Sequence, residues 1–224
     1  MFTLLSNLDW SVLTDMILSV IPALICITLH ELSHGFVAYK LGDTTAKEMG
    51  RLSLNPLKHI DIIGLIMMAV FHFGWAKPVP VNMFRFKNPK RGMAICAAAG
   101  PIANLLIAAV FMALYGFLWP VLYGSAVGDV ILGMLNTTAI ISISFAIFNV
   151  IPIPPLDGSK VLFSFVPAHI YNKLMRYERY GMLLLIALVY FGVIDGFLDN
   201  AVMFLYEKFF VIAQGACNLG NLIF

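Results

Sequence analysis

The sequence places groups that could bind a metal ion in an otherwise apolar stretch. Residues 27–36 read ITLHELSHGF, with His30, Glu31 and His34 inside them. In a helix, His30 and His34 lie one turn apart on the same face, so both imidazoles can reach one ion. Glu31 lies about 100° around the axis, near enough for its carboxylate to contact a water on that ion. The spacing is that of zinc hydrolase helices, in which the glutamate is the general base.

This pattern has an alternative interpretation. The two histidines could be buried and hydrogen-bonded, with the glutamate side chain extending toward water. The surroundings argue against it, because an ionisable side chain within a membrane helix costs about 2.5–3.5 kcal/mol and is functional by default. We therefore predict that His30 and His34 bind a metal ion and that Glu31 is the catalytic base.

Catalytic zinc usually has three protein ligands and a water, so two histidines leave one ligand to be found. No third histidine follows HELSH at a short interval. The candidates are His59, His72, His169 and acids within the membrane, and Asp157 in FNVIPIPPLDGSK is the strongest of them. PPLDG is also an ordinary proline-led turn, so a purely structural role for Asp157 is the alternative.

The elements that must position these groups are membrane helices. The chain has 224 residues, of which 61% are hydrophobic and 12% charged, whereas soluble domains have about 25% charged residues. We predict one integral membrane domain over 1–224, with a catalytic core at about 12–160 and C-terminal helices at about 161–224. The three cysteines have no metal-site spacing, and no basic run with interleaved aromatic residues suggests nucleic acid as a partner.

Several apolar stretches approach the roughly 20 residues that cross a bilayer. The predicted spans are 12–39, 93–118, 130–151 and 180–194. Two shorter stretches, 60–73 and 201–213, either cross, re-enter or lie at the interface. The predicted fold is an all-α multi-pass membrane protein with four to six transmembrane helices and a short re-entrant or β-like loop near the active site.

Charge predicts the orientation. Nine of the 14 Lys and Arg residues lie between Lys40 and Arg91, and four more lie between Lys160 and Arg179. The first 25 residues carry none, which also argues for a retained helix over a cleaved signal. The positive-inside rule then places the N-terminus outside and the 40–91 loop in the cytoplasm. The end of the first helix and Asp157 are thereby expected on the same, cytoplasmic side.

Two motifs together resemble the site-2 protease family of intramembrane zinc metalloproteases. Its members carry HExxH on one core helix and N-x-x-P-x-x-x-x-D-G on a later one; here these are HELSH and NVIPIPPLDG (149–158). GRLSLNPLKHIDIIG (50–64), GWAKPVPVN (74–82) and AAGPIANLL (98–106) are similar to the short prokaryotic branch. The likeness weakens after about residue 160, Ile62 replaces a frequent proline, and no PDZ-like insertion is present.

This resemblance implies one Zn²⁺ per chain, bound by His30, His34 and Asp157, in the cell membrane of a prokaryote. Glu31 would deprotonate the zinc-bound water and pass its proton to the leaving amide nitrogen. The implied substrates are transmembrane protein segments, with the lipid bilayer as the other partner. Asn149 would hold the unwound substrate backbone, although a hydrogen bond between helices is an equal alternative.

Other features keep two interpretations each. The VPVN of GWAKPVPVN is either an edge strand for an unwound substrate or a loop on the bilayer. Gly100 and Asn104 share a helix face, for tight packing or for a polar link to the active helix. His59 and His72 support the site or lie at the interface, and Asp195 and Asp199 suit a solvated helix end.

Two rival functions from other classes are a membrane cation transporter and a catalytically inactive binder of membrane helices. The transporter predicts charged residues on several helices, but the second and fourth predicted helices have almost none. The intact Glu31 argues against an inactive binder.

Overall fold

The computed structural model describes residues 10–61, 64, 76–167, 170–171 and 178–224. The bounded helices are α2 (Trp10–Lys40), α3 (Thr45–Glu48), η1 (Pro56–Lys58), η2 (Met83–Arg85), α5 (Pro89–Leu122), α6 (Ala126–Val150), α7 (Asp157–Phe163), α9 (Glu178–Tyr190) and α10 (Asp195–Ile223). Within these described ranges there is no strand. The predicted all-α class is confirmed, because a helix satisfies its own backbone hydrogen bonds where water is absent.

Local sequence signals determine where the long helices begin and end. Asn88 caps α5 by accepting a hydrogen bond from the Arg91 backbone N–H, and Pro89 occupies the first helical position. Ser125 caps α6 in the same way through the Gly128 N–H. α6 ends at Val150, two residues before Pro152, since proline cannot donate to the helical ladder.

Three helices are long and apolar enough to cross a membrane: Leu18–Lys40 within α2, Pro89–Leu122 and Ala126–Val150. Tyr180–Tyr190 and Asp195–Ile223 form a fourth span only if counted together, because they are bent by 82° at the break. The count is therefore three or four in the described part of the chain. The predicted span 180–194 is interrupted after Tyr190, and the short stretch 201–213 lies inside α10. Most of 60–73 lies outside the described residues.

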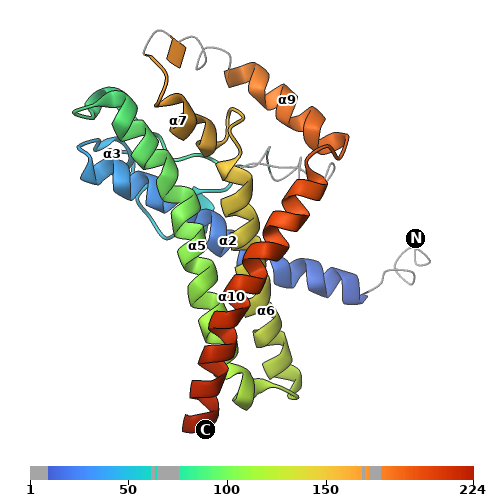
Figure 1. Cartoon of the computed structure of the whole chain (residues 1–224). Coiled ribbons are helices and arrows are strands. Elements are labelled where there is room, and N and C mark those ends of the chain that lie inside the picture. The colour runs from blue at the N-terminus through green and yellow to red at the C-terminus, as the bar shows by residue number, and fades with distance from the viewer. Residues whose placement is uncertain (1–9, 62–63, 65–75, 168–169, 172–177) are drawn as a thin grey trace, which may run out of the picture.

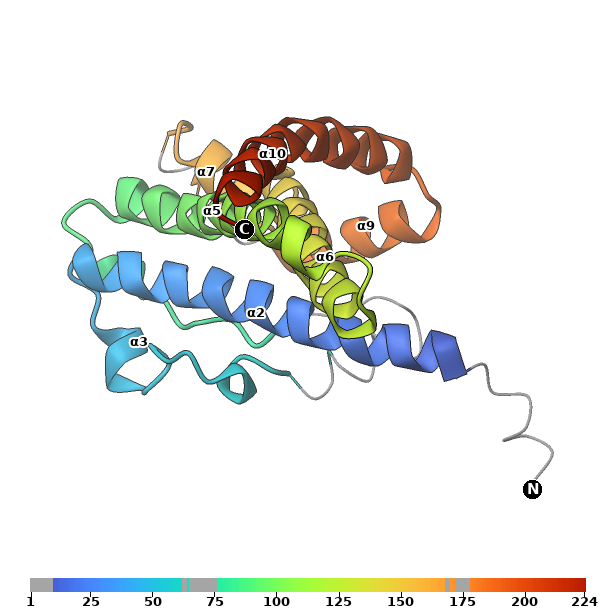
Figure 2. The ribbon, with the colours of Figure 1, turned by 90° about the horizontal axis from the view of Figure 1, so that it is seen from below.

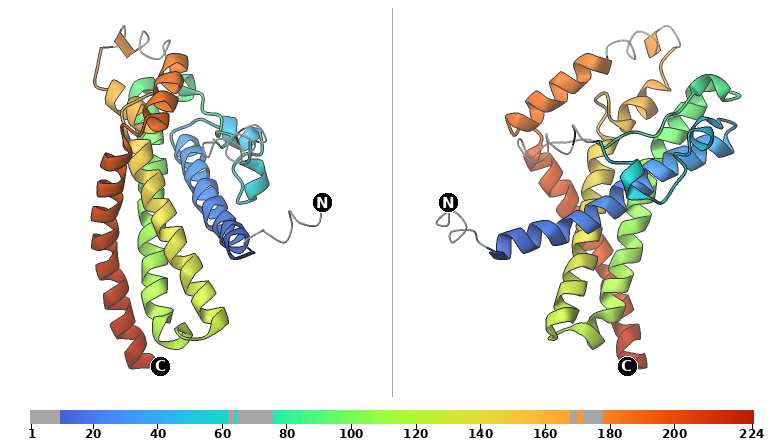
Figure 3. Two further views of the ribbon diagram at one scale, coloured as in Figure 1. Left: turned by 90° about the vertical axis from the view of Figure 1, so that its right-hand side faces the viewer. Right: turned by 180° about the vertical axis from the view of Figure 1, so that it is seen from behind.

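α5 is the central helix, in contact with α2, α6, α7 and α10. α5, α6 and α10 run side by side, and α2 crosses them obliquely (Figures 1 and 3). Seen from below, α2 and α10 lie on opposite sides of α5 (Figure 2). α3 and α7 lie at one end of the molecule, and the α5–α6 turn and the C-terminus lie at the other (Figure 1).

Two clusters of buried side chains hold this arrangement. Met112, Ala139 and Ala213 meet where α5, α6 and α10 cross. A Cβ on Gly116 would lie 1.9 Å from the Ala213 carbonyl oxygen, so only glycine permits this approach of two membrane helices. The second cluster, centred on Ala38 and Cys96, packs the C-terminal half of α2 against the start of α5.

Candidate metal centre

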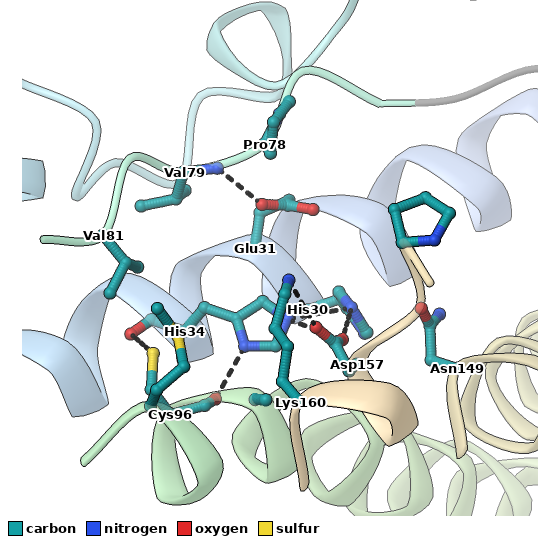
Figure 4. Close-up of a pocket in the computed structure, with 13 residues that line it drawn as sticks. His30, Glu31, His34, Pro78, Val79, Val81, Cys96, Asn149, Asp157 and Lys160 are labelled. Atoms are coloured by element: carbon teal, nitrogen blue, oxygen red, sulfur yellow. Dashed lines mark hydrogen bonds and ion pairs between the residues drawn. The ribbon is translucent and has the colours of Figure 1, made fainter. Parts of the chain in front are cut away.

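His30 and His34 of α2 meet Asp157, the first residue of α7, at one point (Figure 4). Asp157 Oδ2 lies 3.3 Å from His30 Nε2 and 3.1 Å from His34 Nε2. The two Nε2 atoms are 3.1 Å apart. Ligand atoms about 2.0 Å from a tetrahedral ion are roughly 3.3 Å from one another, so the three atoms match the edges of a zinc site.

The other sequence candidates lie elsewhere. His59 is buried, and its Nε2 lies 2.9 Å from the Ser53 carbonyl oxygen, away from the three grouped side chains. Asp195 and Asp199 are exposed on the first turns of α10, as a solvated helix end requires. His72 and His169 lie outside the described residues.

α5 holds His34 in the tautomer that a metal site needs. His34 Nδ1 lies 2.8 Å from the Cys96 carbonyl oxygen. A carbonyl only accepts, so Nδ1 carries a hydrogen, and Nε2, on the side of Asp157, is the atom that can bind a metal ion once its own hydrogen is lost. The Cys96 thiol returns a hydrogen bond to the His34 carbonyl oxygen at 3.3 Å.

Asn104 on α5 makes the corresponding contact to His30. Its Nδ2 lies 3.1 Å from His30 Nδ1, while its buried Oδ1 has no partner. A half-turn of the amide exchanges the two atoms and lets Oδ1 accept from a protonated Nδ1. His30 Nε2 would then also be the atom that can bind a metal ion once its hydrogen is lost. The surroundings of the donors therefore fit a bound metal ion.

Gly100 lies one turn before Asn104, against the two imidazole rings. A Cβ there would come within 2.5 Å of His30 Cε1 and of His34 Nε2. Both interpretations of the Gly100–Asn104 pair thus apply: the glycine permits close packing and the asparagine supplies the polar link to α2. The sequence alone could not decide between them, because the decision depends on which face of α5 meets α2.

Asp157 is the first residue of α7, outside the membrane-spanning helices. Burial opposes its ionisation, but hydrogen bonds from His30 and His34 outweigh burial and hold the pKa of the carboxyl below its usual range. Asp157 is therefore a carboxylate at neutral pH, which is the form that binds metals.

Glu31 lies beside the three grouped side chains but points toward the segment 76–82 (Figure 4). Its Oε2 accepts a hydrogen bond from the Val79 backbone N–H at 2.8 Å. Asp43 fixes the same segment further along, since its Oδ2 accepts from the Asn82 N–H at 2.6 Å. The segment is extended and lies near the site, as predicted, but it is not assigned as a strand.

A cavity of about 320 Å³ opens over the grouped side chains. Beyond His30, Glu31, His34 and Asp157, its lining consists of Pro78, Val79, Val81, Met93, Cys96, Ala97, Asn149, Pro155 and Lys160. Asn149 donates to the Phe145 carbonyl oxygen of its own helix at 3.0 Å, rather than to another helix. It therefore lies at the cavity, and among the described residues the alternative expected for it, a hydrogen bond between helices, is not found.

Sequence reasoning missed two of these groups. The Val79 N–H is a backbone donor, which no side-chain pattern reveals. Lys160 lies 3.5 Å from Asp157 Oδ1 through an i,i+3 pairing on α7. That spacing is visible in the sequence, but it predicts a contact between the two side chains only if a helix is expected to begin at Asp157.

Membrane-spanning helices around a His-His-Asp group, with a glutamate alongside, define a membrane-embedded metallohydrolase. Comparison with known proteins agrees: residues 121–192 match the family described as peptidase family M50. "Putative zinc metalloprotease YwhC" of Bacillus subtilis (strain 168) is 37% identical over 175 residues, covering 75% of this chain and 78% of the relative. The chain belongs to peptidase family M50, the site-2 protease family.

Two further relatives carry the same description as zinc metalloproteases. Rip2 of Mycolicibacterium smegmatis is 29% identical over 171 residues, covering 74% of this chain and 64% of the relative. MJ0611 of Methanocaldococcus jannaschii is 33% identical over 134 residues, covering 59% and 62%. No solved structure matches the chain. The protein is accordingly a zinc metalloprotease of the site-2 protease type.

Proposed function

We propose that this protease hydrolyses peptide bonds in or near transmembrane segments of other membrane proteins, at the plasma membrane of a prokaryote. One observation carries the proposal: HELSH lies on a helix apolar enough to span the bilayer, and its cavity is lined in part by residues of three membrane helices, α2, α5 and α6. We therefore expect a substrate to reach this cavity through or along the lipid phase. Neither the transporter nor the inactive binder accounts for a base beside a His-His-Asp group.

His30, His34 and Asp157 are the proposed zinc ligands. When bound, zinc supplies Lewis-acid chemistry, polarising the scissile carbonyl and lowering the pKa of a coordinated water to about 7. The ligand side chains are themselves held from behind, by Cys96, Asn104 and α7. Their orientation is therefore set before a substrate arrives.

Glu31 is the proposed general base and acid. Its carboxylate removes a proton from the attacking water and then delivers that proton to the leaving amide nitrogen. The Val79 N–H holds Oε2, so the carboxylate has a fixed direction and Oε1 remains for proton transfer.

A helical substrate must be unwound before hydrolysis, because its peptide groups are hydrogen-bonded to one another. Asn149 lines the cavity and is the proposed partner for an exposed peptide group. The segment 76–82 is the proposed second contact, with an extended backbone interrupted by Pro78 and Pro80. Those prolines lack N–H groups, and the N–H groups of Lys77, Val79 and Asn82 already donate to His59, Glu31 and Asp43. Between Lys77 and Asn82, the Val81 N–H is therefore the backbone donor left for pairing.

The test compares Glu31→Gln with the wild-type protein in proteoliposomes that contain a model transmembrane substrate. The variant keeps the three ligands, so we expect one zinc per chain in both proteins. Hydrolysis should fall by about 10²–10⁴-fold, the usual contribution of a general base. Cleavage by Glu31→Gln at near wild-type rate would show that Glu31 is not the base. A wild-type enzyme that cleaves only soluble peptides would refute the substrate class.

A further inference from the structure

A lysine faces the metal centre and has no role in the chemistry described so far. Lys160 follows Asp157 by three residues on α7, and its side chain lines the cavity (Figure 4). Its Nζ lies 3.5 Å from Asp157 Oδ1, with side chains 26% and 10% exposed. Within the described part of the chain, no other hydrogen-bond or ion-pair partner is found for this ammonium group. Limited exposure reduces the screening of the pair by solvent.

The two carboxylate oxygens of Asp157 therefore have different neighbours. Oδ2 faces His30 Nε2 and His34 Nε2, while Oδ1 faces Lys160. A carboxylate can bind a metal ion through one oxygen or through both. Binding through both would occupy a position that a catalytic zinc site keeps for water or substrate.

We propose that Lys160 is a positioning residue that makes Asp157 a one-oxygen ligand. The ammonium group attracts Oδ1 and holds it away from the ion, and Oδ2 is presented to the ion beside the two imidazoles. A coordination position thus stays open for the reaction. This inference rests on the proposed function, because it takes Asp157 as a zinc ligand.

The experiment measures metal binding without proteolysis. Purified protein is loaded with Co²⁺ in place of zinc, because four-coordinate Co²⁺ absorbs visible light much more strongly than five-coordinate Co²⁺. In Lys160→Met, we expect a weaker visible band, since both oxygens of Asp157 become free to bind. Zinc affinity, measured by competition with a chelator, should rise about tenfold, because a second ligand oxygen binds and a positive charge beside the cation is removed.

Two further variants separate charge from structure. Lys160→Arg should restore the band and the affinity, because guanidinium also pairs with a carboxylate. Lys87→Met is the matched control, because Lys87 is an exposed lysine outside the cavity, and it should leave both quantities unchanged. Lys160→Gln, neutral but polar, is the second test of the lost charge, and circular dichroism verifies that each variant is folded.

The outcomes distinguish the two proposals. If wild-type protein takes up no Co²⁺, the ligand assignment of the proposed function fails. If it takes up one ion and a folded Lys160→Met or Lys160→Gln shows the same band and affinity, the role of Lys160 is refuted. Failure of both neutral variants to fold, or of Lys160→Arg to restore the band, would also refute it, because Lys160 would then act through packing.

Discussion

Each proposed ligand contacts the other two ligands and also one supporting group. The supporting groups are the Cys96 carbonyl for His34, the Asn104 amide for His30 and the Lys160 ammonium for Asp157. Contacts of this kind fix the ring orientation and protonation of metal ligands. Substitution of a ligand and substitution of the group that contacts it should therefore differ in the amount of zinc that the protein retains.

Asp157→Ala tests the ligand that was hardest to infer from the sequence. The variant leaves two histidines, fewer than the three protein ligands of a catalytic zinc site. We expect zinc content well below one per chain and no detectable cleavage, measured by metal analysis of purified protein. Asp195→Ala is the control, because Asp195 is an exposed acid at the start of α10. Full zinc content in Asp157→Ala would show that the third ligand is another residue, for example a histidine.

Asn104→Leu tests the support behind His30. Leucine is similar in size but cannot accept a hydrogen bond from Nδ1, so the imidazole loses its fixed tautomer. We expect zinc affinity to fall about 10–100-fold with helix content unchanged. Asn136→Leu is the matched control: Asn136 accepts from the Tyr206 hydroxyl at 2.9 Å, on membrane helices away from the site. Equal effects of the two substitutions on zinc affinity would contradict a specific role for Asn104.

At the scale of elements, the approach of α5 to α2 determines the geometry of the site. Gly100→Ala places a Cβ within 2.5 Å of both imidazoles, and overpacking of this kind costs about 1–3 kcal/mol. We expect Gly100→Ala to lose zinc and to unfold at lower temperature, measured by metal analysis and thermal denaturation. Gly133→Ala is the control, because a Cβ there meets nothing within 4 Å. Retention of zinc by Gly100→Ala would show that α5 can move away without harm.

The sequence predicted the elements better than it predicted their junctions. Apolar runs located the first three spans, because membrane helices need about 20 apolar residues wherever they pack. The break between 180–194 and 201–213 was expected at the polar stretch 195–200, whereas the helix ends at Tyr190 and the next begins at Asp195. The angle of 82° between the two helices could not be predicted, because nothing local encodes it. The grouping of His30 and His34 on one helix face could be predicted from the helical period alone. The hydrogen bond from the Val79 N–H to Glu31 could not, because it joins residues 48 positions apart.

At the scale of the whole molecule, the metal centre lies toward one end. α3 and α7 are at that end, and the α5–α6 turn and the C-terminus are at the opposite end (Figure 1). The basic residues between Lys40 and Arg91 flank the same end as the metal centre, whereas 119–129 has none. The positive-inside rule therefore favours a cytoplasmic metal centre and an external α5–α6 turn. An enzyme so oriented would cut its substrates toward the cytoplasmic side of the membrane.

Thiol labelling in intact cells tests this orientation. Tyr123→Cys reports on the α5–α6 turn, where Tyr123 is 66% exposed, and Lys87→Cys reports on the opposite end. The neighbouring Gly124 is not replaced by cysteine, because a side chain at its φ of 86° would strain the backbone. Cys217 is first replaced by serine, since Cys26 and Cys96 are buried but Cys217 is partly exposed. We expect a membrane-impermeant reagent to label only Tyr123→Cys in intact cells and both variants after lysis. Labelling of Lys87→Cys alone in intact cells would invert the orientation and place the metal centre toward the outside.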